Sequence, residues 1–560
     1  MPDDTKLAEL LFPRITKVPE DYEVLYPPRD LPEGAMVTRF SPSPTGFLHI
    51  GNLMPAFIGQ LCARASGGVF FLRIEDTDKK REVENGVLGI LEGLSAFDIL
   101  PDEGATSQSE ERGAYGPYQQ SRRGEIYRCY AKELVRRGLA YPCFCTEAEL
   151  EAQREQQGAR GLNKGYYGEW AACRDLSLAE QEAFLRAGRP FVLRLRSGGE
   201  SSGRQIAFDD LIRGRIEMPE NNMDAVLLKT DGIPTYHFAH AVDDHLMRVT
   251  HVIRGDEWIA SVPLHLALFA ACGFKPPRYA HISPLMKEDG GGKRKLSKRR
   301  DPEAAVSYFI EQGFPADSVL EYLLTLLNSN FEDWRKANPL AERGAFPFHL
   351  KKISPSGALF DLLKLTDVSK NRISLLPAAE VYGQALAWAR VYDPELAAVF
   401  EQDPEYARNI LNIDRETAKP RKDIAKWSEL RDYLSYFYDA WLCGGFSLPE
   451  TVAPQGIAPA DAAAILTRYR EVYAEADDRE AWFQRIRELC EPLGFTPQVK
   501  EYKKNPEAYK GHVGDVSAVL RLALTGRTNT PDLFSIMGSL GRERVLARLD
   551  AALRRLTSGI

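Results

Sequence analysis

The segment from Ser41 to Asn52 carries the first side chains that could do chemistry. It reads SPSPTGFLHIGN and lies between a short β-forming run and an apolar helical pattern. Open parallel sheets bind ligands at this position, where a strand ends and a helix begins. His49 and Asn52 are three residues apart, so both could point from the first helical turn toward a phosphate, and Gly51 lets a flat ligand approach the backbone. A lone histidine there is usually a cap; only the whole segment favours a ligand site.

A basic run, KRKLSKRR from Lys293 to Arg300, is the second group. It follows three glycines, and six of its eight residues are basic. Such a run is often a solvated loop, but the glycines also fit a mobile loop that closes over a polyphosphate, where lysine balances negative charge. The chain has neither a Walker-type loop nor a GxGxxG fingerprint, so the commonest alternative nucleotide sites are excluded.

Cys143, Cys145 and Cys173 form the third group. Three thiolates within about thirty residues could hold zinc together with a fourth ligand. No fourth ligand is evident, because Tyr166 and Tyr167 are poor candidates and no histidine lies between Cys145 and Cys173. Packed thiols without metal are the favoured interpretation, and zinc is the alternative.

The elements that must position these groups follow an α/β rhythm. We expect strands and helices to alternate over 36–40, 48–65, 69–74 and 81–97, and again over 249–254, 261–272 and 279–286. This alternation predicts a parallel sheet with crossover helices. The segment between these two α/β stretches has a different sequence pattern, which predicts a Glu/Gln-rich helix and short strands near 191–195 and 225–229. One α/β domain interrupted by an insertion is the simplest account.

From about Asp301 onward the pattern is almost wholly helical, with amphipathic segments such as 460–475 and 479–493. Before the first strand, 34 residues with six prolines predict an extension that is wrapped on the surface or partly mobile. The fold class is therefore multidomain: α/β with an α+β insertion, followed by all-α domains.

Composition narrows the class of protein. The chain has 560 residues, 44% hydrophobic and 27% charged, which excludes wholesale disorder and leaves room for about three to five domains. The net charge of -7 means that nucleic acid could bind only through a local basic surface. Eight cysteines are too few for a disulfide scaffold. No signal pattern and no apolar run of about 18 residues is present, so we expect a cytoplasmic protein that does not enter the membrane.

The two loop segments together resemble the HIGH and KMSKS signatures of class I aminoacyl-tRNA synthetases, the second through Lys295 to Arg299, KLSKR. Their surroundings are similar to the bacterial-type glutamyl-tRNA synthetase family. The resembling segments are Arg39-Phe40, LRIEDTD at 72–78, GPYQQS at 116–121, PTYHFAHAVDDH at 234–245 and VIRGDEW at 252–258. The likeness is close over about 36–310, weaker through the helical part, and returns near 522–549.

The resemblance implies an ATP-dependent ligation of L-glutamate to tRNA(Glu) through glutamyl-adenylate, with release of AMP and pyrophosphate, for protein synthesis. ATP and Mg²⁺ are the implied cofactors, and some bacterial relatives hold zinc in the insertion. The rivals are glutaminyl-tRNA synthetase, a truncated tRNA-modifying relative, a small nucleotidyltransferase and a catalytically dead RNA-binding regulator. The opening motif, the chain length and the retained His49, Arg254 and Lys298 argue against them.

The resemblance also implies roles for single residues. Arg39 and Arg254 suit the two carboxylates of glutamate, and Glu75 suits its ammonium group. The residues implied to line the same pocket are Ser41, Ser43, Tyr236 and His240, where the family often has Asn at the last position. The residues implied around ATP are His49, Gly51, Asn52, Glu257, Lys295, Ser297 and Lys298.

The implied organisation is a Rossmann-type catalytic domain in two halves, with helical tRNA-binding domains after it. The predicted boundaries are 1–35 for the extension, 36–140 and 234–300 for the catalytic halves, 141–233 for an acceptor-end-binding insertion, 301–378 for a stem-contact domain and 379–560 for an anticodon-binding domain. Basic residues with aromatic neighbours at 415–427 and 500–510 are candidates to meet tRNA. The family also implies a monomer.

Overall fold

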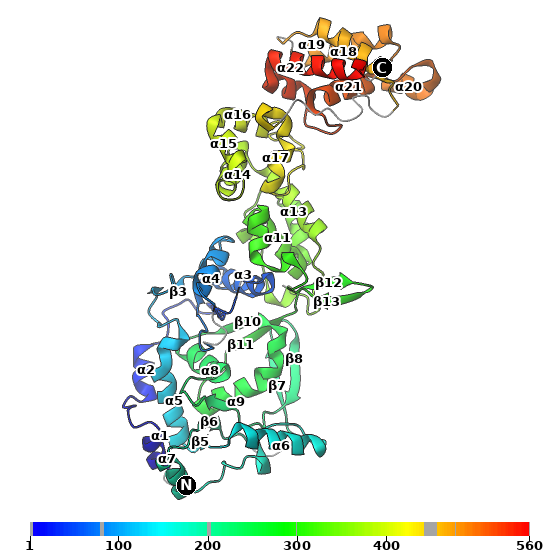
Figure 1. The fold of residues 1–560 in the computed structure, drawn as a ribbon. Coiled ribbons are helices and arrows are strands. Elements are labelled where there is room, and N and C mark those ends of the chain that lie inside the picture. Colours follow the sequence, from blue (N-terminus) through cyan, green and yellow to red (C-terminus); the bar gives the residue numbers. More distant parts are fainter. Residues whose placement is uncertain are drawn as a thin grey trace. The chain divides into compact units, whose positions relative to one another are not determined.

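The computed structural model describes residues 4–46, 48–78, 83–198, 203–297, 299–441, 456–475 and 478–558. The chain divides into two compact units (Figure 1). Unit 1 comprises Met1–Ile310 and Leu320–Asp361, and unit 2 comprises Glu311–Val319 and Leu362–Ile560.

Parallel strands form the centre of unit 1. Strands β1 (Val37–Phe40), β2 (Val69–Leu72) and β3 (Glu103–Ala105) pair in parallel, and β4 (Glu111–Arg112) adds an antiparallel edge. Strands β10 (His251–Gly255) and β11 (Arg278–Ile282) form a second parallel pair. The backbone N–H groups of Val37 and Thr250 donate to Thr250 Oγ1 and Val37 O at 2.8 and 3.0 Å, which joins β1 to the start of β10. The predicted parallel sheet is confirmed.

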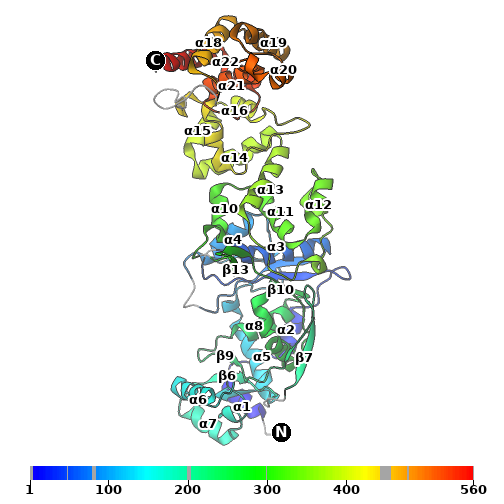
Figure 2. The same ribbon diagram turned by 90° about the vertical axis from the view of Figure 1, so that its right-hand side faces the viewer.

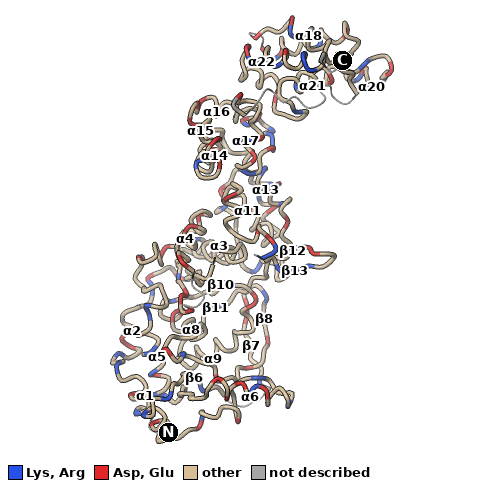
Figure 3. The backbone as a smooth tube through the Cα atoms, in the orientation of Figure 1, with Lys and Arg blue, Asp and Glu red and all other residues tan. Residues whose placement is uncertain are grey.

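The crossover helices lie where the sequence pattern predicts them, with shifted ends. They are α3 (Ile50–Ala65), α4 (Gly86–Ser95), α5 (Gly124–Arg136), α8 (Tyr236–Leu246) and α9 (Val262–Cys272). Within the described residues α4 begins at Gly86, whereas the predicted helix began at Arg81, which lies outside them. The strand predicted for 279–286 ends at Ile282, before Pro284, whose ring removes a ladder donor. Strands β12 (Met286–Asp289) and β13 (Gly292–Lys295) then form a hairpin that carries residues of both charge signs (Figure 3).

The inserted segment contributes to two sheets. Strands β5 (Ala140–Cys143), β6 (Val192–Leu195) and β9 (Val226–Leu228) form an antiparallel sheet. Helices α6 (Glu147–Ala159) and α7 (Leu178–Arg186) both begin with capping boxes, from Thr146 and Ser177. The hairpin of β7 (Gln205–Asp210) and β8 (Gly214–Pro219) instead joins β11, through the pair Tyr279 and Asp210.

The amino-terminal extension is folded, which the sequence analysis did not predict. Helices α1 (Asp4–Leu11) and α2 (Pro19–Leu25) place Leu7, Phe12 and Tyr22 in the hydrophobic core of unit 1, together with residues of α5. Its prolines obscured the helices, although Pro19 occupies the first helical position, where proline is favourable.

Helices account for the remainder of the described chain, as predicted from about Asp301. The first of these helices after the hairpin are α10 (Val306–Gln312), α11 (Ala316–Leu327) and α12 (Asn330–Ala337). Those that follow are α13 (Leu362–Leu375), α14 (Ala378–Tyr392), α15 (Pro394–Gln402), α16 (Pro404–Leu411), α17 (Leu430–Tyr433), α18 (Pro459–Val472), α19 (Arg479–Cys490), α20 (Val499–Lys504), α21 (Val513–Thr525) and α22 (Leu533–Ser558). Helices α18, α19, α21 and α22 pack together around one core that includes Leu466, Ile486 and Leu520 (Figure 2). None of the helices that the structure describes has the length and apolar composition needed to cross a bilayer.

Two side chains of the amino-terminal extension differ in burial, which predicts different effects of their substitution on stability. Phe12 is 7% exposed, whereas Val24 is 83% exposed. We expect Phe12→Ala to destabilise unit 1 by about 3–5 kcal/mol, the usual cost of removing a buried phenyl ring. Val24→Ala should leave stability within about 0.5 kcal/mol. Thermal unfolding followed by circular dichroism measures both, and equal midpoints for the two variants would show that the extension does not belong to the core.

Candidate active site

A cavity of about 500 Å³ opens where the parallel strands of unit 1 end. Arg39 lies in β1, Glu75 follows β2, Arg254 lies near the end of β10, and Ser283 follows β11. The carboxyl ends of parallel strands meet at one edge of a sheet, so these side chains converge without being near in sequence. The volume is in the range of about 300–1,000 Å³ that small-molecule sites occupy.

Most of the predicted site residues line this one cavity. They are Arg39, Ser41, Ser43, His49, Gly51, Asn52, Glu75, Tyr236, Arg254, Glu257 and Lys295. His49 and Lys295, about 250 positions apart in the chain, therefore line the same cavity. His240 and Ser297 are not among the lining residues, and Lys298 lies outside the described part of the chain.

His49 and Gly51 shape the start of α3. His49 is the N-cap, and its Nδ1 accepts a hydrogen bond of 2.8 Å from the backbone N–H of Gly51. A Cβ at position 51 would lie 2.9 Å from that nitrogen, closer than a side chain tolerates. Glycine is therefore required here to keep the imidazole in place, in addition to any approach by a ligand.

The base of the basic loop is held beside the start of α3. His49 forms a β-bridge with Ala305, and the N–H of Val306 donates to Leu48 O at 3.0 Å. Lys295 Nζ lies 3.8 Å from a carboxylate oxygen of Glu257, on a neighbouring wall of the cavity.

Asp301 organises this loop, and the sequence analysis missed it. Its carboxylate accepts from Arg294 at 2.6 and 2.7 Å, from Lys287 at 3.1 Å and from the N–H of Ser297 at 2.9 Å. These hydrogen bonds, with that from Arg294 the largest cause, hold the pKa of Asp301 well below its usual range. An acid directly after a dense basic run was the available signal.

Beneath the cavity lies a buried network of opposite charges. Asp244, in α8, accepts from Arg73 at 2.6 Å and lies 3.3 Å from Arg39 Nε. Arg73 also lies 3.4 Å from Glu75, and its side chain has no exposed surface. Arg73 was predicted only as a member of the segment 72–78. A charged residue within an otherwise apolar strand was the signal that Arg73 belongs to a buried ion-pair network.

Glu75 has an unusual acidity. Burial raises the pKa of its carboxyl to about 7, although Arg73 and Arg39 act in the opposite direction. Asp244 differs: burial also raises its pKa, but Arg39, Arg73 and His240 together bring it well below the usual value. Near neutral pH, Asp244 is therefore ionised and Glu75 is close to its titration midpoint.

Two polar atoms of the cavity wall stand out because they are buried and lack a hydrogen-bond partner among the described residues. These atoms are Ser41 Oγ and Arg254 Nη1. A buried, unsatisfied guanidinium N–H is costly, so a charged acceptor placed here would bind favourably. The cavity is thus suited to an anionic ligand on its Arg254 side.

His240 is fully buried and lies behind the cavity wall. Its ring stacks at 5.9 Å and 15° on Tyr236, which does line the cavity, and its Nδ1 lies 3.0 Å from Asp244. Burial lowers the pKa of His240 to about 4, so it is neutral. The structure therefore places it to support Tyr236.

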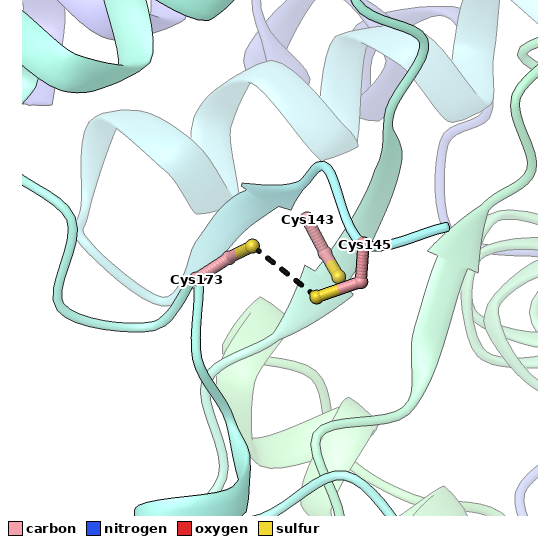
Figure 4. Close-up of side chains that lie close together, drawn as sticks. All are labelled: Cys143, Cys145 and Cys173. Atoms are coloured by element: carbon pink, nitrogen blue, oxygen red, sulfur yellow. Dashed lines mark hydrogen bonds between the residues drawn. The ribbon is translucent and has the colours of Figure 1, made fainter. Parts of the chain in front are cut away.

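The three cysteines come together, as Figure 4 shows. Their sulfur atoms lie within 4.8 Å of one another, and the Sγ atoms of Cys145 and Cys173 are 3.5 Å apart. The hydroxyl of Tyr166, dismissed from the sequence, lies 3.3 Å from Cys145 Sγ. Hydrogen bonds from Cys145 and Cys173 lower the pKa of the Cys143 thiol, whereas hydrogen bonds with Cys143 and Cys173 raise the pKa of Cys145.

Unit 2 contains a second cavity of about 520 Å³ with aromatic and basic walls, among them Trp482, Phe483, Arg479 and Arg521. Trp427, a predicted stacking residue, is instead part of the hydrophobic core of this unit, so it does not face a ligand.

Comparison with known proteins agrees with this geometry. Residues 35–336 match the family model of the catalytic domain of class I tRNA synthetases (E and Q), and residues 395–553 match an anticodon binding domain. The chain is 48% identical to a glutamate–tRNA ligase of Clostridium perfringens (strain 13 / Type A) over 97% of this chain and 99% of that protein. A glutamate–tRNA ligase of Sorangium cellulosum is also 48% identical, over 95% and 97% of the two chains.

Among solved structures, a glutamate tRNA ligase from Elizabethkingia meningosepticum in complex with its amino acid is similar, with a TM-score of 0.73 and 27% identity. The match covers 93% of this chain and 99% of that one.

Proposed function

The chain belongs to the glutamate–tRNA ligase family of class I tRNA synthetases, so it joins L-glutamate to tRNA(Glu) with consumption of ATP, and we propose that the cavity of unit 1 is where glutamate is activated. One observation carries the proposal: the cavity brings a helix start and a basic loop together with Arg39, Arg254 and Glu75. A phosphate site and an acidic amino-acid site thus adjoin.

We propose that Arg39 and Arg254 bind the carboxylates of glutamate and that Glu75 accepts its ammonium group. Arg254 offers an unpartnered Nη1, whereas Arg39 is already partly compensated by Asp244. Ser41, Ser43 and Tyr236 complete the wall. An uncharged side-chain amide in place of the γ-carboxylate would leave a guanidinium less well compensated, which favours glutamate over glutamine.

Around ATP, we propose that His49, Asn52 and the basic loop contact the phosphates, with Glu257 beside the adenosine. The α-carboxylate of glutamate attacks the α-phosphorus, and the bond to the bridging oxygen breaks as pyrophosphate leaves. The protein supplies position and positive charge and no nucleophile. Mg²⁺ is used generally in this class and supplies further neutralisation of phosphate charge. Lys298 stays a predicted member of this group, with Lys295 and Ser297 beside it.

Different regions of the tRNA would be bound by the other parts of the chain. We propose that 141–233 binds the acceptor end, 301–378 contacts the stem and 379–560 binds the anticodon. The cavity of unit 2 supports the last assignment, because the exposed ring of Phe483 can stack on a base and the arginines of its wall can meet phosphates. The cytoplasmic location stays a prediction from the sequence pattern, and the monomeric state stays one from the resemblance.

We also propose that Cys143, Cys145 and Cys173 hold a zinc ion. Sulfur ligands at about 2.3 Å from a tetrahedral zinc are about 3.8 Å apart. The observed sulfur positions, within 4.8 Å of one another, need only a small adjustment to match. Tyr166 is close enough to fill the fourth position, and the zinc would have a structural role in the insertion.

Glutamate-dependent ATP–pyrophosphate exchange, with and without tRNA, tests the proposed site. Arg254→Ala should raise the KM for glutamate about 30- to 100-fold, which corresponds to ~2–3 kcal/mol for a lost charged hydrogen bond. The KM for ATP should change little. Arg278→Ala, at an exposed position of β11, is the matched control. An unchanged requirement for glutamate in Arg254→Ala would remove this residue from the site.

The acidity of Glu75 predicts a pH dependence of binding. Because its pKa is raised to about 7, the carboxylate that accepts the ammonium group is lost as pH falls through 7. We expect kcat/KM for glutamate to decline below pH 7, toward tenfold per pH unit. Glu75→Gln, which is neutral at every pH, should raise the KM at pH 8 about 10- to 100-fold and remove this decline. If the variant keeps the same acidic limb, another group causes it.

The zinc proposal predicts about one zinc per full-length chain by plasma emission analysis. Cys173→Ser should lose most of it, because the change removes one of the three thiolate ligands, whereas Cys272→Ser should retain it, since Cys272 is outside the cluster. Chain purified without chelators that contains no zinc, yet exchanges pyrophosphate, would favour packed thiols.

A further inference from the structure

Two histidines, His281 and His265, contact the guanidinium of Arg254, and neither was predicted as a site residue. The Nε of Arg254 donates to His281 Nε2 at 3.0 Å, and its Nη2 lies 3.3 Å from His265 Nδ1 and 3.4 Å from Trp258 O. The guanidinium also lies over the ring of Tyr279, with 4.9 Å between Cζ and the ring centroid. Only Nη1 has no partner among the described residues.

The proton positions in this cluster follow from the chemistry of arginine. A guanidinium has five N–H donors and no acceptor, so each imidazole nitrogen that faces it must present a lone pair. His281 therefore carries its proton on Nδ1, which lies 2.7 Å from Asp210. His265 likewise carries its proton on Nε2, which lies 2.9 Å from His237 Nδ1. Both rings are neutral, and each has one donor and one acceptor in use.

Asp210 is the fixed end of this chain of hydrogen bonds. One of its carboxylate oxygens accepts from the N–H groups of Ile212 and Arg213 at 3.0 and 2.9 Å. The other accepts from His281, through Nδ1 at 2.7 Å and through the backbone N–H at 3.1 Å. Burial raises the pKa of Asp210, but these hydrogen bonds together lower it, so it stays ionised. Both oxygens are committed, and neither can rotate away without leaving a donor unpaired.

Neutral partners have a consequence for the charge of Arg254. A carboxylate in direct contact would compensate the guanidinium, as Asp244 does for Arg73. An imidazole lone pair fixes the orientation and leaves the charge uncompensated. With Nε and Nη2 occupied, rotation about the side chain would break two hydrogen bonds, so the orientation of the guanidinium is fixed and Nη1 stays the donor without a partner among the described residues.

We propose that His281 and Asp210 are positioning residues for glutamate recognition: Asp210 fixes the tautomer of His281, and His281 fixes the guanidinium of Arg254 so that Nη1 meets a substrate carboxylate. The inference rests on the proposed role of Arg254. It makes β7, which lies in the inserted segment, part of the support of the amino-acid site, because Asp210 ends that strand.

Two substitutions at one position separate this role from simple packing. In His281→Gln the side-chain oxygen can take the place of Nε2, so an acceptor for Arg254 is kept. In His281→Asn the amide takes the place of Nδ1, so the contact with Asp210 is kept and the acceptor is lost. Steady-state exchange should show a KM for glutamate raised about tenfold or more in His281→Asn and about threefold or less in His281→Gln. In both, kcat and the KM for ATP should stay within about threefold.

Asp210→Asn provides a second, independent measurement. An amide has one acceptor oxygen, so it must leave either His281 or the turn at Ile212 and Arg213 facing an N–H group. We expect a rise of about three- to tenfold in the KM for glutamate. Asp209→Asn, at the exposed neighbouring position of the same strand, should change nothing.

The outcomes are distinguishable. Equal KM values for glutamate in His281→Asn and His281→Gln, or equal losses in kcat and in both KM values, would overturn the positioning role. If neither variant shows a cooperative thermal transition, Asp210→Asn decides, and a KM equal to that of Asp209→Asn would overturn it. An unchanged KM in Arg254→Ala would instead refute the proposed function of that residue, whatever His281 does.

Discussion

Compensation of buried guanidinium groups is the constraint on which the site depends. A buried charge is costly unless it is paired and hydrogen-bonded. Arg73 has no exposed surface, and Asp244 and Glu75 compensate it, while Arg123 meets Asp243 at 2.6 Å. Because Asp243 and Asp244 are adjacent in α8, this helix must lie against the end of β2, which Arg73 follows, and against the 3-10 turn Gln120–Arg123. The charge network therefore fixes the position of α8, and with it Tyr236 in the cavity wall.

The two arginines that line the cavity, Arg39 and Arg254, differ in how their charges are compensated. Arg39 shares Asp244 with Arg73, so its charge is partly compensated before any ligand arrives. Arg254 has neutral partners and keeps an unpartnered donor. A ligand carboxylate would pair with the uncompensated charge of Arg254. At Arg39 it would compete with the carboxylate of Asp244. In the proposed site, a glutamate carboxylate supplies the negative charge that Arg254 does not receive from its histidine partners.

The phosphate end follows another principle. His49 and Asn52 line the cavity at the start of α3, and Lys295 of β13 lines the same cavity. Asp301 holds the base of the loop through Arg294, Lys287 and the N–H of Ser297. A loop anchored at its base can move at its tip without losing register, which suits a segment that must admit and release a nucleotide.

The sequence by itself determined the elements and the residue types of the site. The α/β rhythm predicted the parallel sheet, and most of the site residues predicted from the two loop segments and the resemblance they carry do line the cavity. Local chemistry suffices for this, because strand and helix periodicity and turn residues act over a few positions. Even so, prolines obscured α1 and α2, whose burial depends on a core formed by distant helices.

Only the tertiary structure decided which atoms of these residues form hydrogen bonds and which face the cavity. Nothing in the sequence shows that Asp210 faces His281, that His281 faces Arg254, or that His240 lies behind Tyr236 and not in the cavity. Tyr166 was dismissed for its residue type and lies beside the cysteines because the chain returns there. The pKa of Glu75 depends on burial, which is a sum over neighbours from several elements. Hydrogen bonds and desolvation act over a few ångströms in space, between residues that the sequence separates by tens to hundreds of positions.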